Sequence, residues 1–376
     1  MNHNYILTGS TGILGSHILY ELMMKIHLND YQGSIVLLIR EKKNVTLNKR
    51  LKELFKSELI PDFLHTIDFK RIIKENITLL KHDLVKEEFP LEELNKEKQY
   101  TLIHSAASVN LGTNISTSEE IQKINYTGTI LLINKLKPFI SQITYISTAF
   151  SSGHQNGLIP NYFNFDSTVS NYRNPYEEYK SKTESELISF CKTNNIKHQI
   201  IRPSIICGRL FDAPLFVISK FLVFYLFGAF FLRFKELYGQ QPIRIAMNKD
   251  SGLNLIPVDY AAKAIAKAIE TDLTELTIAS NKCLQNKIAL PQLLKQVGWT
   301  SFEIITEIPD NLNHIEQLYY KTVGAQLNNY LSTPVHEFDV AVLNELMHDY
   351  SQPDVSLQFE NLVGYAVDNS FISLID

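Results

Sequence analysis

Residues 4–15, NYILTGSTGILG, join a short apolar run to three glycines, Gly9, Gly12 and Gly15. The run predicts a β-strand, and the residues that follow, HILYELMMK (17–25), have the apolar spacing of a helix. A GxxGxxG array between a strand and a helix is typical of dinucleotide-binding turns. Gly9 permits the sharp turn, Gly12 lets the backbone approach a pyrophosphate, and Gly15 lets helix and strand pack closely.

Further strands follow at intervals along the first two thirds of the chain. They are read from short apolar runs with helical or loop segments between most of them: SIVLLIR (34–40), NITLLKHD (76–83), YTLIHSAA (100–107), ITYISTAF (143–150) and HQIIRPSII (198–206). Apolar strands that alternate with helices indicate a parallel sheet covered on both faces. We therefore predict an α/β fold of the Rossmann type, with a doubly wound parallel sheet.

The composition changes after about residue 210. We predict a nucleotide-binding domain over residues 1–210. At about residues 250–270 the segment LNLIPVDYAAKAI (253–265) is expected to return the chain to the sheet of this domain. Residues 211–249 and 271–376 are expected to form a smaller, mostly helical part that binds the substrate.

Composition excludes several classes of protein. The chain has 376 residues, of which 45% are hydrophobic and 20% charged, so it is not largely disordered. The net charge of -4 offers no basic surface for nucleic acid. No HExxH or CxxC cluster predicts a metal site, and no GxSxG motif indicates a serine hydrolase. Three scattered cysteines and an N-terminus without the pattern of a signal peptide favour a cytoplasmic location.

The end of the second strand bears on the choice of cofactor. Arg40 stands there, with Lys42 and Lys43 close behind and Glu41 between them. A guanidinium at this place suits the 2′-phosphate of NADPH, whereas NAD-binding proteins usually place a carboxylate there. We expect NADPH rather than NADH, and the alternative is a solvated run of charges.

A YxxxK pair, Tyr176 and Lys180, is the main candidate for catalysis. Four residues apart on a helix, the two side chains share one face, and an ammonium beside a phenol is expected to lower the pKa of the phenol. Thr148 ends a predicted strand and is placed to hold a substrate carbonyl oxygen. Asn125, within a predicted helix, either supports Lys180 through a water molecule or is a surface amide.

Residues 215–232, LFVISKFLVFYLFGAFFL, form an almost uninterrupted apolar stretch. Its uncharged part, residues 221–232, is too short to span a bilayer. Three interpretations remain open for it: a buried core helix, an apolar wall for a long acyl chain, or a surface that docks on a membrane.

Several of these motifs occur in an order that resembles the extended short-chain dehydrogenase/reductase family. The motifs are TGSTGILG, Asp83 after HD, IHSAASVN, KINYTGT, YISTAF, NPYEEYK and RPSIICG. IHSAASVN, YISTAF and LNLIPVDYAAKAI look most like the branch of fatty acyl-CoA reductases and thioester-reductase domains, whose NAD(P)-binding domain is of the male-sterility type. The resemblance covers residues 4 to 270, and the long loop 153–173 leaves the mouth of the substrate site undefined.

The resemblance implies a role for each matching position. Catalysis would involve Thr148, Tyr176, Lys180 and Asn125. The cofactor-binding residues would be Gly9, Ser10, Thr11, Gly12, Ile13, Leu14, Gly15, Arg40, Asp83, Leu84, Ser105, Ala106, Ala107, Pro203, Ser204 and Ile205.

The expected activity is NADPH-dependent reduction of a carbonyl or acyl thioester with a lipid-like acyl group, giving an aldehyde or alcohol. The partner would be coenzyme A or an acyl carrier protein, and oligomers are common in the family. The alternatives are an NAD-dependent sugar-nucleotide epimerase or dehydratase, a hydroxysteroid-type dehydrogenase, and a dinucleotide-sensing protein without turnover.

Overall fold

A seven-stranded parallel sheet forms the centre of the computed structural model, which describes residues 3–42, 45–86, 88–162, 171–238 and 241–375. The strands lie in the order β12-β7-β5-β4-β1-β2-β3, with every pair parallel. Their bounds are β1 Asn4–Thr8, β2 Ser34–Ile39, β3 Ile77–Lys81, β4 Tyr100–His104, β5 Ile140–Ile146, β7 Lys197–Pro203 and β12 Glu275–Ile278. This is the order of a doubly wound fold, and it confirms the predicted class.

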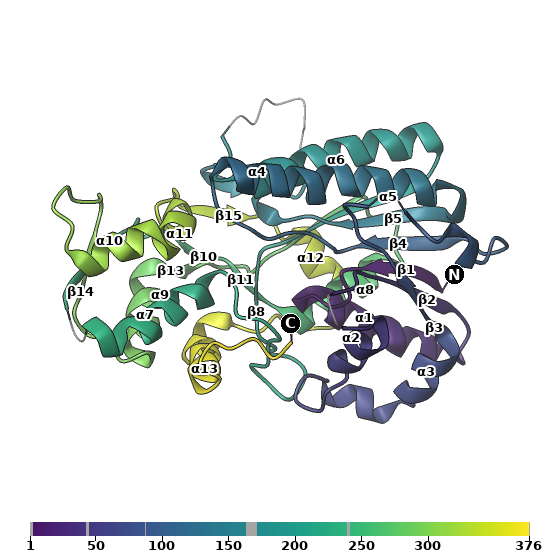
Figure 1. Ribbon diagram of the computed structural model, residues 1–376, viewed down its shortest axis with the longest axis horizontal. Helices are drawn as coiled ribbons and strands as arrows, with labels where there is room; N and C mark the ends of the chain where they lie inside the picture. Colours follow the sequence, from purple (N-terminus) through teal and green to yellow (C-terminus); the bar gives the residue numbers. More distant parts are fainter. Residues whose placement is uncertain (1–2, 43–44, 87, 163–170, 239–240, 376) are drawn as a thin grey trace.

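Helices cover both faces of this sheet, so most residues of its inner strands are buried (Figure 1). One face carries α1 Ile13–Leu28, α2 Leu47–Leu54, α3 Phe69–Asn76 and α8 Val258–Ala268. The other carries α4 Ile115–Ile121, α5 Thr129–Leu136 and α6 Pro175–Asn194, with a π-helical turn, Gln122–Gly128, between α4 and α5. Each face has its own buried apolar cluster.

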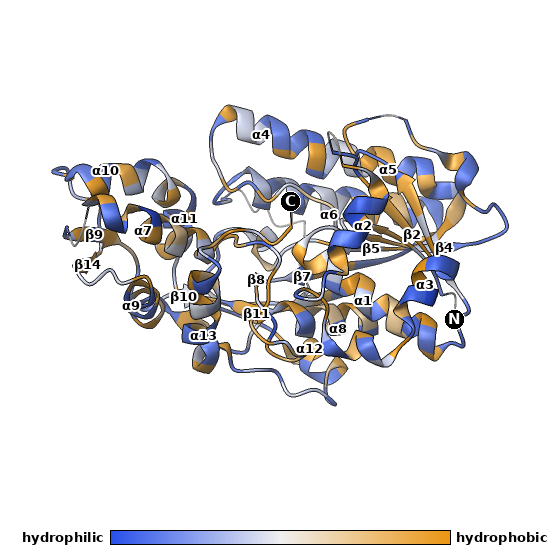
Figure 2. Ribbon diagram, turned by 60° about the horizontal axis from the view of Figure 1, so that its bottom comes forward, coloured by the Kyte–Doolittle hydropathy of each residue, from blue (hydrophilic) through white to orange (hydrophobic). Residues whose placement is uncertain are grey.

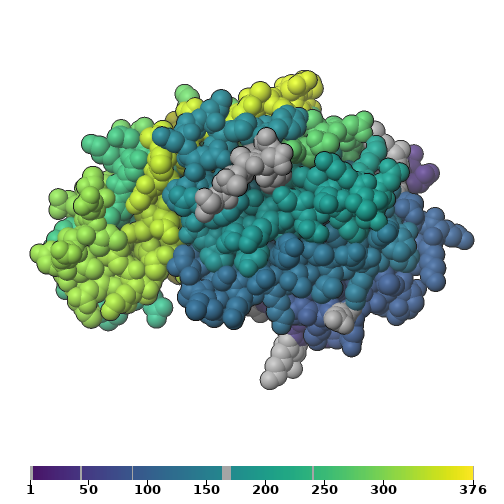
Figure 3. Space-filling view, turned by 90° about the horizontal axis from the view of Figure 1, so that it is seen from above, coloured from purple at the N-terminus to yellow at the C-terminus, as the bar shows by residue number. Residues whose placement is uncertain are grey.

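A smaller part lies beyond the carboxyl ends of the central strands (Figures 1 and 3). Its helices are α7 Phe224–Tyr238, α9 Asn286–Gln296, α10 His314–Lys321, α11 Val323–Leu331 and α13 Val355–Asp368, and α12 Ala341–Leu346 packs near α8. Short strand pairs lie outside the central sheet: β6 Gly157–Ile159 with β15 His336–Phe338, β8 Ile205–Cys207 with β11 Leu255–Pro257, β9 Ile243–Ala246 with β14 Phe302–Ile305, and β10 Gly252–Leu253 with β13 Leu284–Gln285.

One expectation about the chain's return to the sheet is wrong. β11, in the segment LNLIPVDYAAKAI, pairs with β8 in a separate two-stranded sheet. The seventh central strand is β12, which follows α8 and pairs with β7. The helix α8 does return to the nucleotide-binding side, where it packs against α1. The sequence analysis did not identify β12, because this strand, ELTI, has only four residues.

The apolar stretch 215–232 is divided between a loop and a helix. α7, whose ribbon in Figure 2 carries hydrophobic residues, begins only at Phe224. Its buried aromatic side chains are Phe224, Tyr225, Phe227, Phe230 and Phe231. Residues 211–223 form an irregular loop. No helix among the described residues has the length and apolar character needed to cross a membrane. Part of the loop expected at 153–173, residues 163–170, lies outside the described residues.

Candidate active site

Two adjoining cavities lie at the carboxyl ends of the central strands, where open α/β sheets bind their ligands. The first, of about 340 Å³, extends over β1, β2 and the residues after β3. The second, of about 590 Å³, extends from the glycine loop to the start of α6 and the smaller part. Both are lined by Gly9, Gly12, Ser105, Ala107, Ser108 and Lys220, so the two form one continuous cleft.

The glycine loop fits a dinucleotide in this cleft. Gly9 has a φ of +74°, and a Cβ there would lie 2.6 Å from the backbone nitrogen of Ala106. Gly12 caps α1 without a side chain, so the amide groups at the helix N-terminus face the cleft. The hydroxyls of Ser10 and Ser204 are buried and have no hydrogen-bond partner within the described part of the chain. Of these two, Ser204 lines the second cavity, where its hydroxyl suits a ligand with several phosphate and hydroxyl groups, and Ser10 lines neither cavity.

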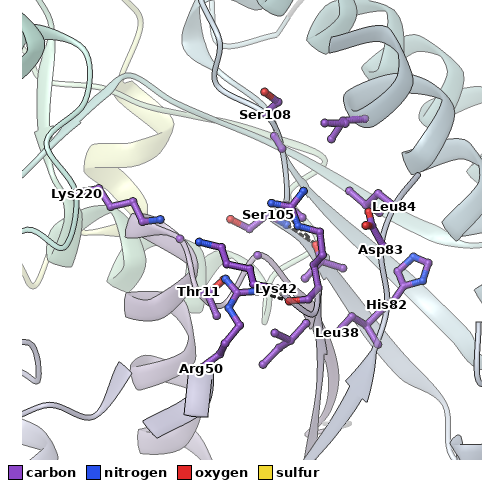
Figure 4. A pocket seen from close by; sticks show the side chains of 18 of the residues that line it. Thr11, Leu38, Lys42, Arg50, His82, Asp83, Leu84, Ser105, Ser108 and Lys220 are labelled. Carbon is purple, nitrogen blue, oxygen red and sulfur yellow. Dashed lines mark hydrogen bonds between the residues drawn. The ribbon is translucent and has the colours of Figure 1, made fainter. Parts of the chain in front are cut away.

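Basic side chains gather at the far end of the first cavity (Figure 4). Arg40 and Lys42 line it as the resemblance implies for Arg40, and Arg50 from α2 lies beside them. The buried Arg50 guanidinium donates to Thr11 Oγ1 at 2.8 Å and to the carbonyl oxygen of Arg40. Asp83 and Leu84 line the same cavity, and Ser105 and Ala107 lie at its inner edge, next to Ala106.

The second cavity brings together the three main candidates for catalysis. Asn174 caps α6 by accepting from the backbone nitrogen of Glu177 at 3.1 Å, and Pro175 occupies the first turn. This start places Tyr176 in the cleft wall beside Thr148, whose hydroxyl hydrogen-bonds the phenol. Lys180 follows one turn later. Ile13, Leu14, Gly15, Pro203, Ser204 and Ile205 line the same cavity.

The expected effect of Lys180 on Tyr176 is not found. Burial raises the pKa of Tyr176, and the charge of Glu177 raises it further. Burial lowers the pKa of Lys180 to about 7, although the charge of Glu184 opposes this shift. The Lys180 ammonium donates to the carbonyl oxygen of Ile146 at 2.7 Å and lies 5.9 Å from the centre of the Tyr176 ring. The sequence argument failed because it counted the charge and omitted the desolvation.

The Asn125 side chain makes contacts that the sequence analysis did not predict. It lies in the π-helical turn, and its amide pairs with both backbone groups of Ser108, at 2.8 Å and 2.9 Å. The backbone carbonyl oxygen of Asn125 accepts a hydrogen bond from the hydroxyl of Thr183 of α6 at 3.1 Å. Asn125 is 1% exposed, so the alternative of a surface amide is wrong. The water-mediated link to Lys180 stays a prediction. The amide holds Ser108, one of the six residues that line both cavities and so form the waist of the cleft.

A buried ion network that the sequence analysis did not identify lies behind Lys180. Glu184, one turn further along α6, accepts from Arg202 of β7 at 2.6 Å and 2.9 Å, and both side chains are fully buried. Ser147, which precedes Thr148, also donates to Glu184. Arg202 makes a second ion pair of 2.6 Å with Glu275 of β12. The network ties α6 to β7, to β12 and to Ser147, which follows β5 and precedes Thr148.

Three other residues of the cleft escaped the sequence analysis. Arg50 stands in a run of exposed basic residues, and its place depends on how α2 folds back. Tyr330 comes from α11, far along the chain, and lines the substrate end. Lys220 carried a usable signal, because it is the charge that interrupts an apolar stretch.

A comparison of the sequence with protein-family models finds one that covers most of this architecture. The model described as "Male sterility protein" matches residues 7–265. The chain belongs to the male sterility protein family. The matched residues include the glycine loop, the YxxxK pair and α8.

Curated relatives of this family member match over a shorter region. Mouse fatty acyl-CoA reductase 1 is 27% identical over 152 residues, 39% of this chain and 28% of the relative. The alcohol-forming fatty acyl-CoA reductase of Simmondsia chinensis is 28% identical over 172 residues, 42% of this chain and 33% of the relative. The isonitrile lipopeptide synthase of Mycobacterium tuberculosis is 28% identical over 155 residues, 38% of this chain and 6% of the relative. The matches thus span a third or less of each relative's length.

Solved structures show the same fold over nearly the whole chain. The terminal R domain of the myxalamid biosynthetic pathway matches with a TM-score of 0.69 and 16% identity, over 99% of this chain and 92% of that one. A thiolation-reductase di-domain from an archaeal peptide synthetase gives 0.65 and 17%, over 98% and 76%. UDP-glucose 4-epimerase of Thermotoga maritima gives 0.62 and 14%, over 97% and 99%. The fold is that of the extended short-chain dehydrogenases/reductases.

Proposed function

We propose that this member of the male sterility protein family is an NADPH-dependent reductase of acyl thioesters with a lipid-like acyl group. The observation that carries the proposal is the single cleft. The first cavity of the cleft is lined by the glycine loop and, at one end, by basic side chains. The second cavity is lined by Thr148, Tyr176 and Lys180. A nicotinamide dinucleotide bound along this cleft would supply a hydride in the second cavity.

The protein's own groups would act on the carbonyl oxygen. Thr148 and Tyr176, already hydrogen-bonded to each other, would donate to that oxygen as negative charge develops on it. The raised pKa of Tyr176 keeps the phenol protonated, so it can give its proton to the oxygen after hydride addition. The resulting hemithioacetal would lose its C–S bond to give an aldehyde and a thiol. A second reduction would give the alcohol.

A small apolar cavity behind the site, of about 40 Å³, supports an acyl group with an apolar end. It shares Ile205, Val223 and Tyr330 with the catalytic cavity and continues between α7, α9, α11 and α13. Its other lining residues are Phe224, Phe227, Leu253, Asn286, Ala289, Leu290, Leu293, Leu327, Leu331 and Phe359, of which only Asn286 is polar. Burial of methylene groups there would be favourable by about 0.8 kcal/mol each.

NADPH is favoured over NADH by the basic end of the first cavity. Arg40, Lys42 and Arg50 line it together, and Asp83 and Glu120 are the acidic residues in the lining of the same cavity. Guanidinium groups form strong, charge-assisted hydrogen bonds with phosphate. This arrangement suits the 2′-phosphate that distinguishes NADPH.

The acyl carrier would be coenzyme A or the phosphopantetheine arm of a carrier protein. The names of the relatives support both, since they include a fatty acyl-CoA reductase and a thiolation-reductase di-domain. The catalytic cavity includes the exposed Val109 and the half-buried Asn110, where a thioester arm could enter.

A sugar-nucleotide epimerase is the second candidate, because epimerases of this fold match the chain over its length. The apolar cavity behind Tyr330 opposes it, since a hydroxyl-rich sugar there would lose its hydrogen bonds to water.

The test of the proposed function is NADPH oxidation against a matched panel of acyl-CoAs of increasing length, the corresponding free aldehydes, and UDP-glucose. We expect oxidation with long-chain acyl-CoA and with the aldehyde. The proposal would be refuted if none of the thioesters and aldehydes supported NADPH oxidation while UDP-glucose was epimerised.

The lowered pKa of Lys180 predicts a pH dependence. Its ammonium is present below pH 7 and is lost as the pH rises through about 7. Because Lys180 lines the cavity in which negative charge would develop on the carbonyl oxygen, loss of its charge should lower kcat/KM above an apparent pKa near 7. Lys180→Arg, whose guanidinium stays charged, should remove that fall in whatever activity it retains. A wild-type profile that is flat from pH 6 to pH 9 would contradict this assignment.

A further inference from the structure

We infer that Lys220 is a dinucleotide-binding residue that closes the waist of the cleft over the pyrophosphate, opposite the glycine loop. The inference rests on the proposed function, because it takes the dinucleotide to lie along both cavities. Lys220 comes from the loop between β8 and α7, outside the glycine loop and outside every motif of the resemblance.

The position of Lys220 within the cleft is the first support. Of the six residues that line both cavities, Lys220 is the one with a charged side chain. The others are glycines, serines and an alanine from the opposite wall. In Figure 4 the Lys220 side chain extends toward Thr11 and Ser105 from the far side of the pocket. The pyrophosphate of a dinucleotide held by a glycine loop sits at this point, beside the N-terminus of α1.

Hydrogen bonds hold the backbone that leads to Lys220. Asp259 of α8 accepts from the backbone nitrogens of Phe211 and Asp212, each at 2.7 Å. Arg209 and Phe216 are joined by a backbone hydrogen bond of 2.7 Å, and Leu374 donates to the carbonyl oxygen of Ser219 at 2.9 Å. The position of the lysine is therefore built into the fold.

Side-chain burial then fixes the direction in which Lys220 points. Val217, Ile218 and Ser219 before it and Phe221 after it are all buried. Lys220 is the partly exposed residue among them, and it lines the cleft. A lysine placed this way can reach the cleft with its ammonium while its methylene groups cover the apolar neighbours.

Electrostatics favour an anion between the two walls. The glycine loop offers backbone N–H groups, and no acidic residue lies in the first turn of α1. The segment Ser105–Gly112 on the opposite wall contains no cation. Glu120, which lines the first cavity, accepts from the Ser108 hydroxyl at 2.7 Å, so Lys220 is the cation at this point of the cleft that can balance added negative charge. An ammonium from the opposite side would complete the neutralisation of a doubly charged pyrophosphate.

Calorimetric titration of the purified chain with three probes tests this inference. NADP⁺ has both the pyrophosphate and the 2′-phosphate, NAD⁺ has the pyrophosphate alone, and 2′-AMP has the 2′-phosphate alone. Lys220→Met should raise the Kd of NADP⁺ and of NAD⁺ by a similar factor, roughly tenfold to a hundredfold, and leave the Kd of 2′-AMP unchanged. Lys220→Arg should recover most of the affinity.

Two comparison variants separate this inference from the proposed cofactor. Arg50→Gln should weaken NADP⁺ and 2′-AMP and leave NAD⁺ unchanged, the opposite pattern. Lys282→Met, at an exposed lysine far from the cleft, should change none of the three. If wild type binds NADP⁺ tightly and Lys220→Met binds it equally well, the inference is wrong and the proposed function stands. A Lys220→Met variant that raises only the KM of acyl-CoA would also overturn it, whereas a wild type that binds no dinucleotide refutes the proposed function itself.

Discussion

Replacing Tyr176 with phenylalanine should lower kcat for thioester and aldehyde reduction by about 10²- to 10⁴-fold, the usual contribution of a positioned acid. The hydroxyl that is removed hydrogen-bonds Thr148 and points into the catalytic cavity. The ring stays, so α6 should keep its packing and the chain its affinity for NADP⁺. Stopped-flow measurement of NADPH oxidation, with a separate titration of NADP⁺, measures both quantities.

Tyr179→Phe is the matched control for this change. Tyr179 lies on the same helix, three residues further along, where its ring packs near Tyr126 and Lys182 outside the catalytic cavity. It should keep wild-type kcat. Equal activity in Tyr176→Phe and wild type would mean that another group supplies the proton. A protein that only senses the dinucleotide would show no turnover in any of the three chains.

Glu184→Gln should lower the free energy of unfolding by about 3 kcal/mol, at the low end of the effect of breaking a buried ion pair. The substitution leaves Arg202 buried with a neutral neighbour in place of two contacts to a carboxylate. Arg202 keeps its ion pair with Glu275, which limits the loss. The pKa of Lys180 should fall further, because the charge of Glu184 raises it. Urea unfolding followed by circular dichroism measures the stability.

The control for the ion network is Glu186→Gln, at an exposed position of the same helix. A neutral change there should alter stability by less than about 0.5 kcal/mol. If Glu184→Gln were as stable as Glu186→Gln, the buried network would contribute nothing, and its part in holding α6 against the sheet would have to be abandoned.

Local patterns were sufficient to predict the nucleotide-binding half of the fold. The glycine array, the apolar strands and the YxxxK pair each occupy one short segment, and their order along the chain defines the sheet. β12 was missed, since four residues with a single alternation give no clear period. β11 was placed in the wrong sheet because its sequence is as apolar as a central strand.

The cleft itself depends on contacts between distant segments. Arg50 and Lys220 reach it from a helix and a loop that no motif marks, and Tyr330 reaches it from the last third of the chain. The raised pKa of Tyr176 depends on how deeply the phenol is surrounded, which residue spacing does not encode. Sequence reasoning therefore found the groups that share an element and missed those that meet only after folding.

The most direct test of the central claim is a transfer experiment with NADPH deuterated at the reactive C4 position of its nicotinamide. The wild-type chain is mixed with a long-chain acyl-CoA, and the product is analysed by mass spectrometry. The account predicts one deuterium at C1 of the aldehyde for each turnover, or two in the alcohol, and the label should be absent with Tyr176→Phe on the same timescale. A wild-type product without deuterium, or label that never leaves the cofactor in the presence of any thioester, would contradict it.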